Sequence, residues 1–119
     1  MTPRTAAATG ALWAALAVAA GAFGAHGLEG LVSGDLLGTF ETAVRYQMFH
    51  ALGLLAAAAI GPRACRAAPW LLAGSLVFSG SLYLLVAGAP NWFGAVAPVG
   101  GLLMIWGWVY LAILGLRGE

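Results

Sequence analysis

The chain has 119 residues, of which 62% are hydrophobic and only 8% are charged. Ordinary soluble domains are about 45–50% apolar and about 25% charged, so this composition excludes a water-soluble globule. A disordered chain is excluded as well, because disorder requires low hydrophobicity and high charge. The five basic residues nearly balance the four acidic ones and form no cluster, which argues against a nucleic-acid partner.

Four apolar runs follow one another along the chain, separated by polar or helix-breaking segments. The first run ends in a glycine-rich stretch, and Asp35, in the acidic connection after it, is placed to cap the second helix. Gly61 and Pro62 stop the second run, and a turn that starts at Gly88 breaks the third. The sequence therefore predicts an all-α integral membrane bundle, a single domain with transmembrane spans at about residues 6–26, 38–60, 69–88 and 95–116.

The arginines predict the orientation of this bundle, because basic residues are retained on the cytoplasmic side of a membrane. Arg4, Arg63, Arg66 and Arg117 lie at the amino end, in the second connection and at the carboxyl end. With four spans, these three places share one face. We therefore expect both termini to be cytoplasmic and the acidic first connection to lie outside.

The first span has an alternative interpretation as a secretory signal peptide. Arg4, the apolar run and the small pair Ala20 and Ala22 fit such a peptide with its cleavage site. Cleavage after Ala22 leaves three spans with the same inside loop, so an intact mass distinguishes the two forms. We expect the span to be retained, because it is longer than the apolar core of a signal peptide, which has about 7–15 residues.

Small residues recur at helical spacing in three of the spans, a pattern that marks close helix packing in membranes. Gly10 and Ala14 are four residues apart in the first span, as are Ser75 and Ser79 in the third. The fourth span predicts a glycine seam with roughly seven-residue spacing, formed by Gly100, Gly101, Gly107 and Gly115.

The second span carries a dense polar cluster that consists of Glu41, Arg45, Tyr46, Gln47 and His50. Glu41 precedes Arg45 by four residues, the favourable order for an ion pair on a helix, so we expect the two to pair. Counting back from the predicted inner boundary at residue 60, His50 lies about 15 Å into the membrane, near its midplane.

An ionisable residue at this depth is by default a candidate functional site. For His50 the sequence leaves three roles open: a neutral imidazole that links helices, a proton or solute site, and a contact with another subunit. In the first role its partner would be Ser79, Ser81, Tyr83 or a backbone carbonyl. We expect a neutral ring at pH 7.

Metal, cofactor and catalytic roles have little support. His26 stands about 15 Å above His50 if the helices are straight, and Cys65 lies at the opposite boundary, so no His/Cys set has ligand spacing. Three serines of the third span have no carboxylate nearby in the sequence. We therefore expect no metal, no cofactor and no enzymatic activity.

Four blocks of the sequence are distinctive: GAFGAHGL from residue 21, TAVRYQMFHAL from residue 42, FSGSLYL from residue 78 and PVGG from residue 98. They resemble the signatures of a family of small bacterial membrane proteins of unknown function, which includes the YgdD-like and YwdK-like proteins and, in eukaryotes, the transmembrane protein 256 type. The resemblance implies four helices, a retained first span and a bacterial cytoplasmic (inner) membrane location. It implies no reaction, substrate or catalytic residue.

These observations lead to a functional expectation of binding rather than catalysis. We expect a scaffold or accessory subunit in a homo- or hetero-oligomeric membrane complex, in contact with the lipid bilayer. The alternative is a small oligomeric transporter or channel for a small solute or a proton, which would use His50, Gln47 and Arg45.

Overall fold

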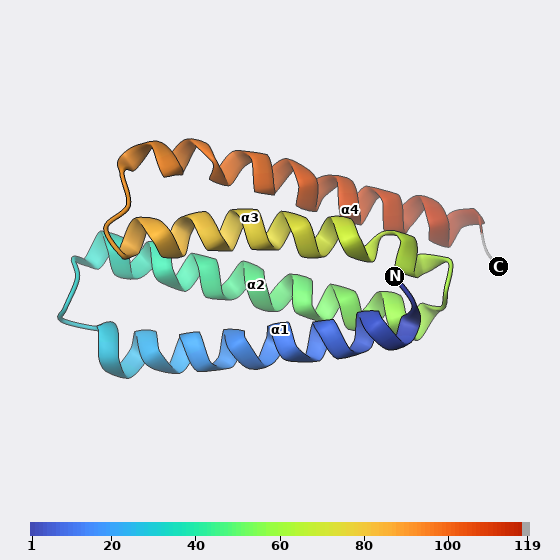
Figure 1. The fold of residues 1–119 in the computed structure, drawn as a ribbon, viewed down its shortest axis with the longest axis horizontal. Coiled ribbons are helices and arrows are strands. Elements are labelled where there is room, and N and C mark those ends of the chain that lie inside the picture. Colours follow the sequence, from blue (N-terminus) through green and yellow to red (C-terminus); the bar gives the residue numbers. More distant parts are fainter. Residues whose placement is uncertain (118–119) are drawn as a thin grey trace.

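A computed structural model of the chain describes residues 1–117. This part of the chain folds into four long helices joined by short helical turns, with no β-strand among the described residues. The start of α1 and the end of α4 lie at the same end of the bundle (Figure 1). The elements in chain order are α1 (Pro3–Phe23), η1 (Gly24–Leu28), α2 (Gly34–Ile60), η2 (Ala64–Arg66), α3 (Ala68–Val86), η3 (Asn91–Ala95) and α4 (Ala97–Arg117).

Each long helix, together with the short turn beside it where one is present, is long and apolar enough to cross a membrane. The predicted all-helical fold with four such helices is therefore confirmed. α2 starts a few residues earlier than expected, and its amino-terminal cap differs from the predicted one. The hydroxyl of Ser33, rather than the carboxylate of Asp35, accepts the backbone N–H of Leu36 at 3.2 Å, since an N-cap bonds a backbone N–H two or three residues on.

The four helices form a thin body in which α2 and α3 are central. The principal contacts join α1 to α2, α2 to α3 and α3 to α4, and the principal extents of the chain are 50 × 27 × 17 Å. In Figure 1 the four helices run side by side in chain order. α1 and α4 flank the central pair and leave much of their apolar surface exposed, as a lipid-facing surface requires.

Glycines allow the helix backbones to approach closely at two seams. A Cβ atom added at Gly10 would lie 2.8 Å from the carbonyl oxygen of Ala51, and one at Gly107 would lie 2.8 Å from the Leu71 side chain. Gly100 meets the backbone of Phe78 even more closely. The predicted seam of α4 therefore involves Gly100 and Gly107. Gly101 and Gly115 do not take part, because an added Cβ at either position meets no atom of the described residues within 4 Å.

The end of the bundle opposite the termini, which we call the far end, begins with a π-helical turn. This turn, η1, continues α1 to Leu28. Gly24 lies against the ring of Phe40, and an added Cβ there would come within 2.8 Å of it. The rings of Phe23 and Phe40 meet edge to face at 6.2 Å. The π-turn therefore fixes the start of the first connection against α2, and π-turns often occur at functional sites.

Candidate functional site

The buried face of α2 carries two polar side chains in the middle of the bundle. Gln47 is 2% exposed and His50 is 3% exposed. They belong to a stripe of buried residues at helical spacing that also includes Ala43 and Leu54, so they point toward the neighbouring helices. We call the hydrogen-bonded group around them the buried polar layer, which consists of Trp13, Gln47, His50, Ser75, Ser79, Tyr83 and Trp108.

Gln47 connects three helices through its side-chain amide. The Tyr83 hydroxyl of α3 donates to Oε1 of Gln47 at 2.6 Å, and Nε2 of Gln47 donates to the Trp13 carbonyl of α1 at 2.9 Å. Trp13 in turn donates its indole N–H to the Ser75 hydroxyl at 2.9 Å. These bonds give α1, α2 and α3 a fixed register, because a misplaced helix leaves several buried polar groups without partners.

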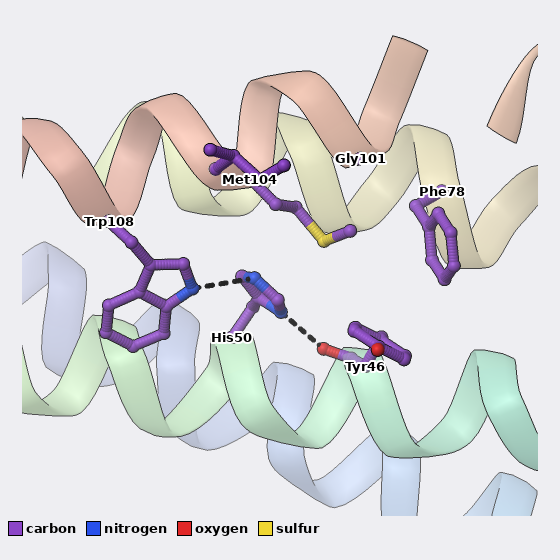
Figure 2. A pocket seen from close by; sticks show the side chains of 7 residues that line it. Tyr46, His50, Phe78, Gly101, Met104 and Trp108 are labelled. Carbon is purple, nitrogen blue, oxygen red and sulfur yellow. Dashed lines mark hydrogen bonds between the residues drawn. The ribbon is translucent and has the colours of Figure 1, made fainter. Parts of the chain in front are cut away.

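His50 connects α2 to α4, and its partners define its tautomer. The indole N–H of Trp108 can only donate, and it does so to Nε2 of His50 at 3.0 Å. Nδ1 of His50 therefore carries the proton and donates to the Tyr46 carbonyl at 2.6 Å. Figure 2 shows the ring held between these two partners. This arrangement requires the neutral ring, the form expected from the sequence.

The partners that the sequence offered for His50 are engaged elsewhere, except for a backbone carbonyl. Ser79 donates to the Ala43 carbonyl of α2 at 2.7 Å, and Ser81 donates within its own helix to the Phe78 carbonyl at 2.8 Å. In the described part of the chain, every buried side-chain nitrogen and oxygen atom has a hydrogen-bond partner. The buried polar layer therefore satisfies its buried side-chain atoms with partners inside the protein, which we call its closure.

A pocket of about 330 Å³ lies over His50, on the side that faces α4. We call it the His50 pocket. Tyr46, Ile105 and Trp108 are 37%, 61% and 41% exposed, so the pocket opens on the surface of the bundle. The other lining residues shown in Figure 2 come from α3 and α4, and the full set is Tyr46, His50, Phe78, Gly101, Met104, Ile105 and Trp108.

Glu41 and Arg45 lie on another side of α2, toward α1. Both are exposed, and both line a hollow of about 280 Å³ together with Gly21 of α1 and Gly24 of η1. The predicted ion pair is wrong, since within residues 1–117 the side chains of Glu41 and Arg45 do not pair with each other. The physical reason is exposure, because an exposed pair at this spacing gains only about 0.3–0.5 kcal/mol.

His26 and Cys65 are far from His50. His26 is exposed in η1 at the far end, whereas Cys65 is buried in η2 at the opposite end and donates weakly to the Ala57 carbonyl at 3.5 Å. Within the described residues, no group of three or more His, Cys, Asp or Glu side chains is placed to hold a metal ion.

Two tryptophans of the buried polar layer were missed as functional residues by the sequence reasoning. Neither Trp13 nor Trp108 belongs to the polar cluster that the sequence predicts on the second span. A usable signal was present in both cases, because an indole N–H in the middle of an apolar span needs an acceptor. The sequence alone does not show which acceptor a neighbouring helix provides.

Comparison with known proteins places the chain in a family. The family model described as "Protein of unknown function (DUF423)" matches residues 20–101. A UPF0382 membrane protein of Staphylococcus saprophyticus is 46% identical over 87% of this chain and 90% of its own length. The UPF0382 membrane protein YwdK of Bacillus subtilis is 40% identical over 91% of this chain and 93% of its own.

No solved structure matches the chain. The matched residues include both tryptophan-bonded side chains of α2, namely Gln47 and His50, and the charged pair Glu41 and Arg45. The expected family resemblance is confirmed, and the chain belongs to the DUF423 family, whose matched relatives are membrane proteins.

Proposed function

We propose that this protein is a non-catalytic subunit that binds another membrane protein or a second copy of itself through its lipid-facing surface. The observation that carries this proposal is the closure of the buried polar layer. Both nitrogens of His50 and both amide atoms of Gln47 already have protein partners. A group that transfers protons needs a free lone pair or hydrogen, and the neutral His50 ring, with one donor and one acceptor, has neither to spare.

The surface around the His50 pocket is the proposed docking region. Large side chains are exposed there on α4, notably Ile105 and Trp108, and exposed aromatic residues are enriched where proteins bind one another. The backbone at Gly101 leaves the pocket open, because an added Cβ meets no described atom within 4 Å. A protruding side chain of a partner helix fits such a hollow.

The proposed orientation places both termini in the cytoplasm, in the bacterial cytoplasmic membrane. Four of the five arginines support it, since Arg4, Arg63, Arg66 and Arg117 all belong to the end of the bundle that carries the termini. Short loops rich in arginine stay on the cytoplasmic side. The relatives come from bacteria such as Bacillus subtilis.

Transport of a small solute or a proton is the second candidate. The observation that favours it is that the His50 pocket exposes an ionisable side chain in the middle of the bundle. Arg45 and His50 line different hollows, the first beside α1 and the second beside α3 and α4. A path through both would have to cross the buried polar layer. A transporter of this kind would therefore use His50 without Arg45.

Native mass spectrometry after purification in a mild detergent tests the binding proposal. We expect the wild type to appear as a defined complex and Gly101→Leu, which fills the His50 pocket, to dissociate it. Gly80→Leu is the matched control, because Gly80 also has an open position but lies away from this pocket. A wild type that is monomeric in detergent and in nanodiscs overturns the proposal. Solute flux in liposomes that is lost in His50→Ala favours transport instead.

A further inference from the structure

A second hollow adjoins the one that Arg45 lines, and together they form a groove between α1 and α2 at the far end. The first hollow measures about 280 Å³ and the second about 260 Å³. They share Gly21, Gly24 and Glu41, and the second adds Glu29 of the first connection. We call this the far-end groove. Gly21 of α1 and Gly24 and Ala25 of η1 form one wall, so no large side chain from that wall fills the groove.

The position of the far-end groove along the membrane normal follows from the residues that pack beside it. Phe40, the residue before Glu41, packs its ring on Tyr83 of α3 at 5.2 Å. Tyr83 lies close to the end of α3 at Val86. Glu41 is therefore near the level at which the apolar helices end, where lipid headgroups begin. Arg45 lies four residues further along α2, about 6 Å nearer the bilayer centre.

The charges of the far-end groove are ordered along the membrane normal. Arg45 is the deepest, Glu41 is about one turn nearer the surface, and Glu29 lies in the connection beyond the helices. Glu41 and Arg45 form no ion pair among the described residues. Both side chains are exposed and so can meet the charged groups of a ligand. A ligand with a negative group below a positive one matches this order.

We propose that the far-end groove binds the headgroup of a phospholipid that carries a primary amine, such as phosphatidylethanolamine. Its phosphate, which is attached to the glycerol, sits at the level of Arg45, and its ammonium group reaches outward to Glu41 and Glu29. Arginine forms strong paired hydrogen bonds with phosphate. The apolar walls at Phe40 and Val44 accept the start of the acyl chains.

The same charges discriminate against other headgroups. An anionic headgroup such as phosphatidylglycerol offers Arg45 a phosphate but gives the two carboxylates only neutral hydroxyls, so its net negative charge is repelled without a compensating cation. A choline headgroup has the correct sign, but its quaternary nitrogen has no N–H to donate. The site is separate from the His50 pocket and goes beyond the proposed function, so either one can fail without the other.

Lipid retention measured by native mass spectrometry tests this inference. The whole protein is equilibrated in nanodiscs with equal amounts of phosphatidylethanolamine, phosphatidylglycerol and phosphatidylcholine, and then released. We expect the wild type to retain phosphatidylethanolamine preferentially. Arg45→Gln should reduce this retention about tenfold, because it removes a hydrogen bond between charged groups.

A change of selectivity separates a specific site from general lipid adhesion. Glu41→Gln combined with Glu29→Gln should abolish the preference for the amine and increase retention of phosphatidylglycerol, because the arginine remains without opposing carboxylates. Asp35→Asn is the matched control, since Asp35 is exposed near the start of α2 and lines neither hollow. Gly21→Leu fills the groove without removing a charge and should also reduce retention.

Three results overturn the proposal. The first is equal retention of the three lipids by the wild type. The second is equal retention of phosphatidylethanolamine by the wild type and by both Arg45→Gln and Gly21→Leu. The third is displacement of the lipid by soluble phosphoethanolamine at a concentration similar to that of the protein, which would assign the groove to a free phosphorylated amine rather than to a lipid.

Discussion

The middle of α2 and its far end both carry polar side chains, but only the middle satisfies them within the protein. Gln47 and His50 are buried, and each polar atom of their side chains has a hydrogen-bond partner within the protein. Glu41 and Arg45 are exposed and do not pair. The difference teaches that burial, more than spacing along the helix, decides whether polar groups bond to each other. A buried group without a partner loses its solvation, whereas an exposed one keeps water or headgroups.

The largest loss of stability should come from one added methyl group at Gly100, where α3 and α4 pack most closely. In Gly100→Ala the new Cβ collides with the backbone of Phe78 and lies 2.8 Å from the Gly74 carbonyl, so α3 and α4 must move apart. We expect the free energy of unfolding to fall by about 3 kcal/mol. Unfolding in mixed micelles of increasing SDS fraction measures it. Gly101→Ala should change it by less than about 0.5 kcal/mol, and equal effects would contradict the described seam.

Gln47→Leu should have the next largest effect, because it removes the link between three helices. The Tyr83 hydroxyl then loses its acceptor in a partly buried position, and the Trp13 carbonyl keeps only the backbone bond of its own helix. We expect a loss of about 2 kcal/mol in the free energy of unfolding, measured in the same micelles. Thr42→Val is the control, since the Thr42 hydroxyl bonds only within its own helix. A loss no larger than that of the control would show that the layer contributes little to stability.

Trp108→Phe should weaken the link between α2 and α4 by about 1 kcal/mol, because it removes one hydrogen bond and keeps an aromatic ring. Trp106→Phe is closely matched, since both tryptophans are 41% exposed. Nitrogen-15 NMR of labelled histidine should show His50 in the wild type at pH 7 as neutral, with the proton on Nδ1. Trp108→Phe should shift the Nε2 resonance and Trp106→Phe should not. A doubly protonated ring in the wild type would contradict this assignment.

The smallest effect on stability should come from the charged far end. Glu41→Gln and Arg45→Gln remove exposed charges that form no ion pair with one another, so each should change the free energy of unfolding by less than about 0.5 kcal/mol. The same variants should change lipid retention strongly. A large loss of stability in detergent would mean that these residues hold the bundle together, and the contrast between the two regions would then disappear.

Much of the fold could be predicted from the sequence because membrane helices are encoded locally. Four apolar runs and their glycine and proline breaks place the spans without any knowledge of their neighbours. The π-helical turn at Gly24 could not be predicted in the same way. Gly24 lies against Phe40 of the next helix, a contact between segments that no local pattern indicates.

The sequence identifies the polar residues of the candidate site but not the hydrogen bonds between them. His50 and Gln47 stand out because polar side chains are rare in apolar spans. Their partners Trp13 and Trp108 could not be assigned, since helix rotation and register are set by packing between segments distant in the sequence. The expected ion pair between Glu41 and Arg45 is absent although their spacing along the helix favours it. Spacing is a local property, whereas the exposure of these side chains depends on how the neighbouring helices pack.

The hydrogen bonds of Trp13 have a consequence for the order in which the protein can be assembled during synthesis. Its carbonyl bonds to Gln47, 34 residues later in the chain, and its indole N–H bonds to Ser75, 62 residues later. The first helical hairpin can make the first of these bonds by itself, but it enters the membrane without the partners of the indole N–H and of the glutamine oxygen. Only α3 supplies Ser75 and Tyr83, so these two groups reach their final partners after the third helix has been inserted.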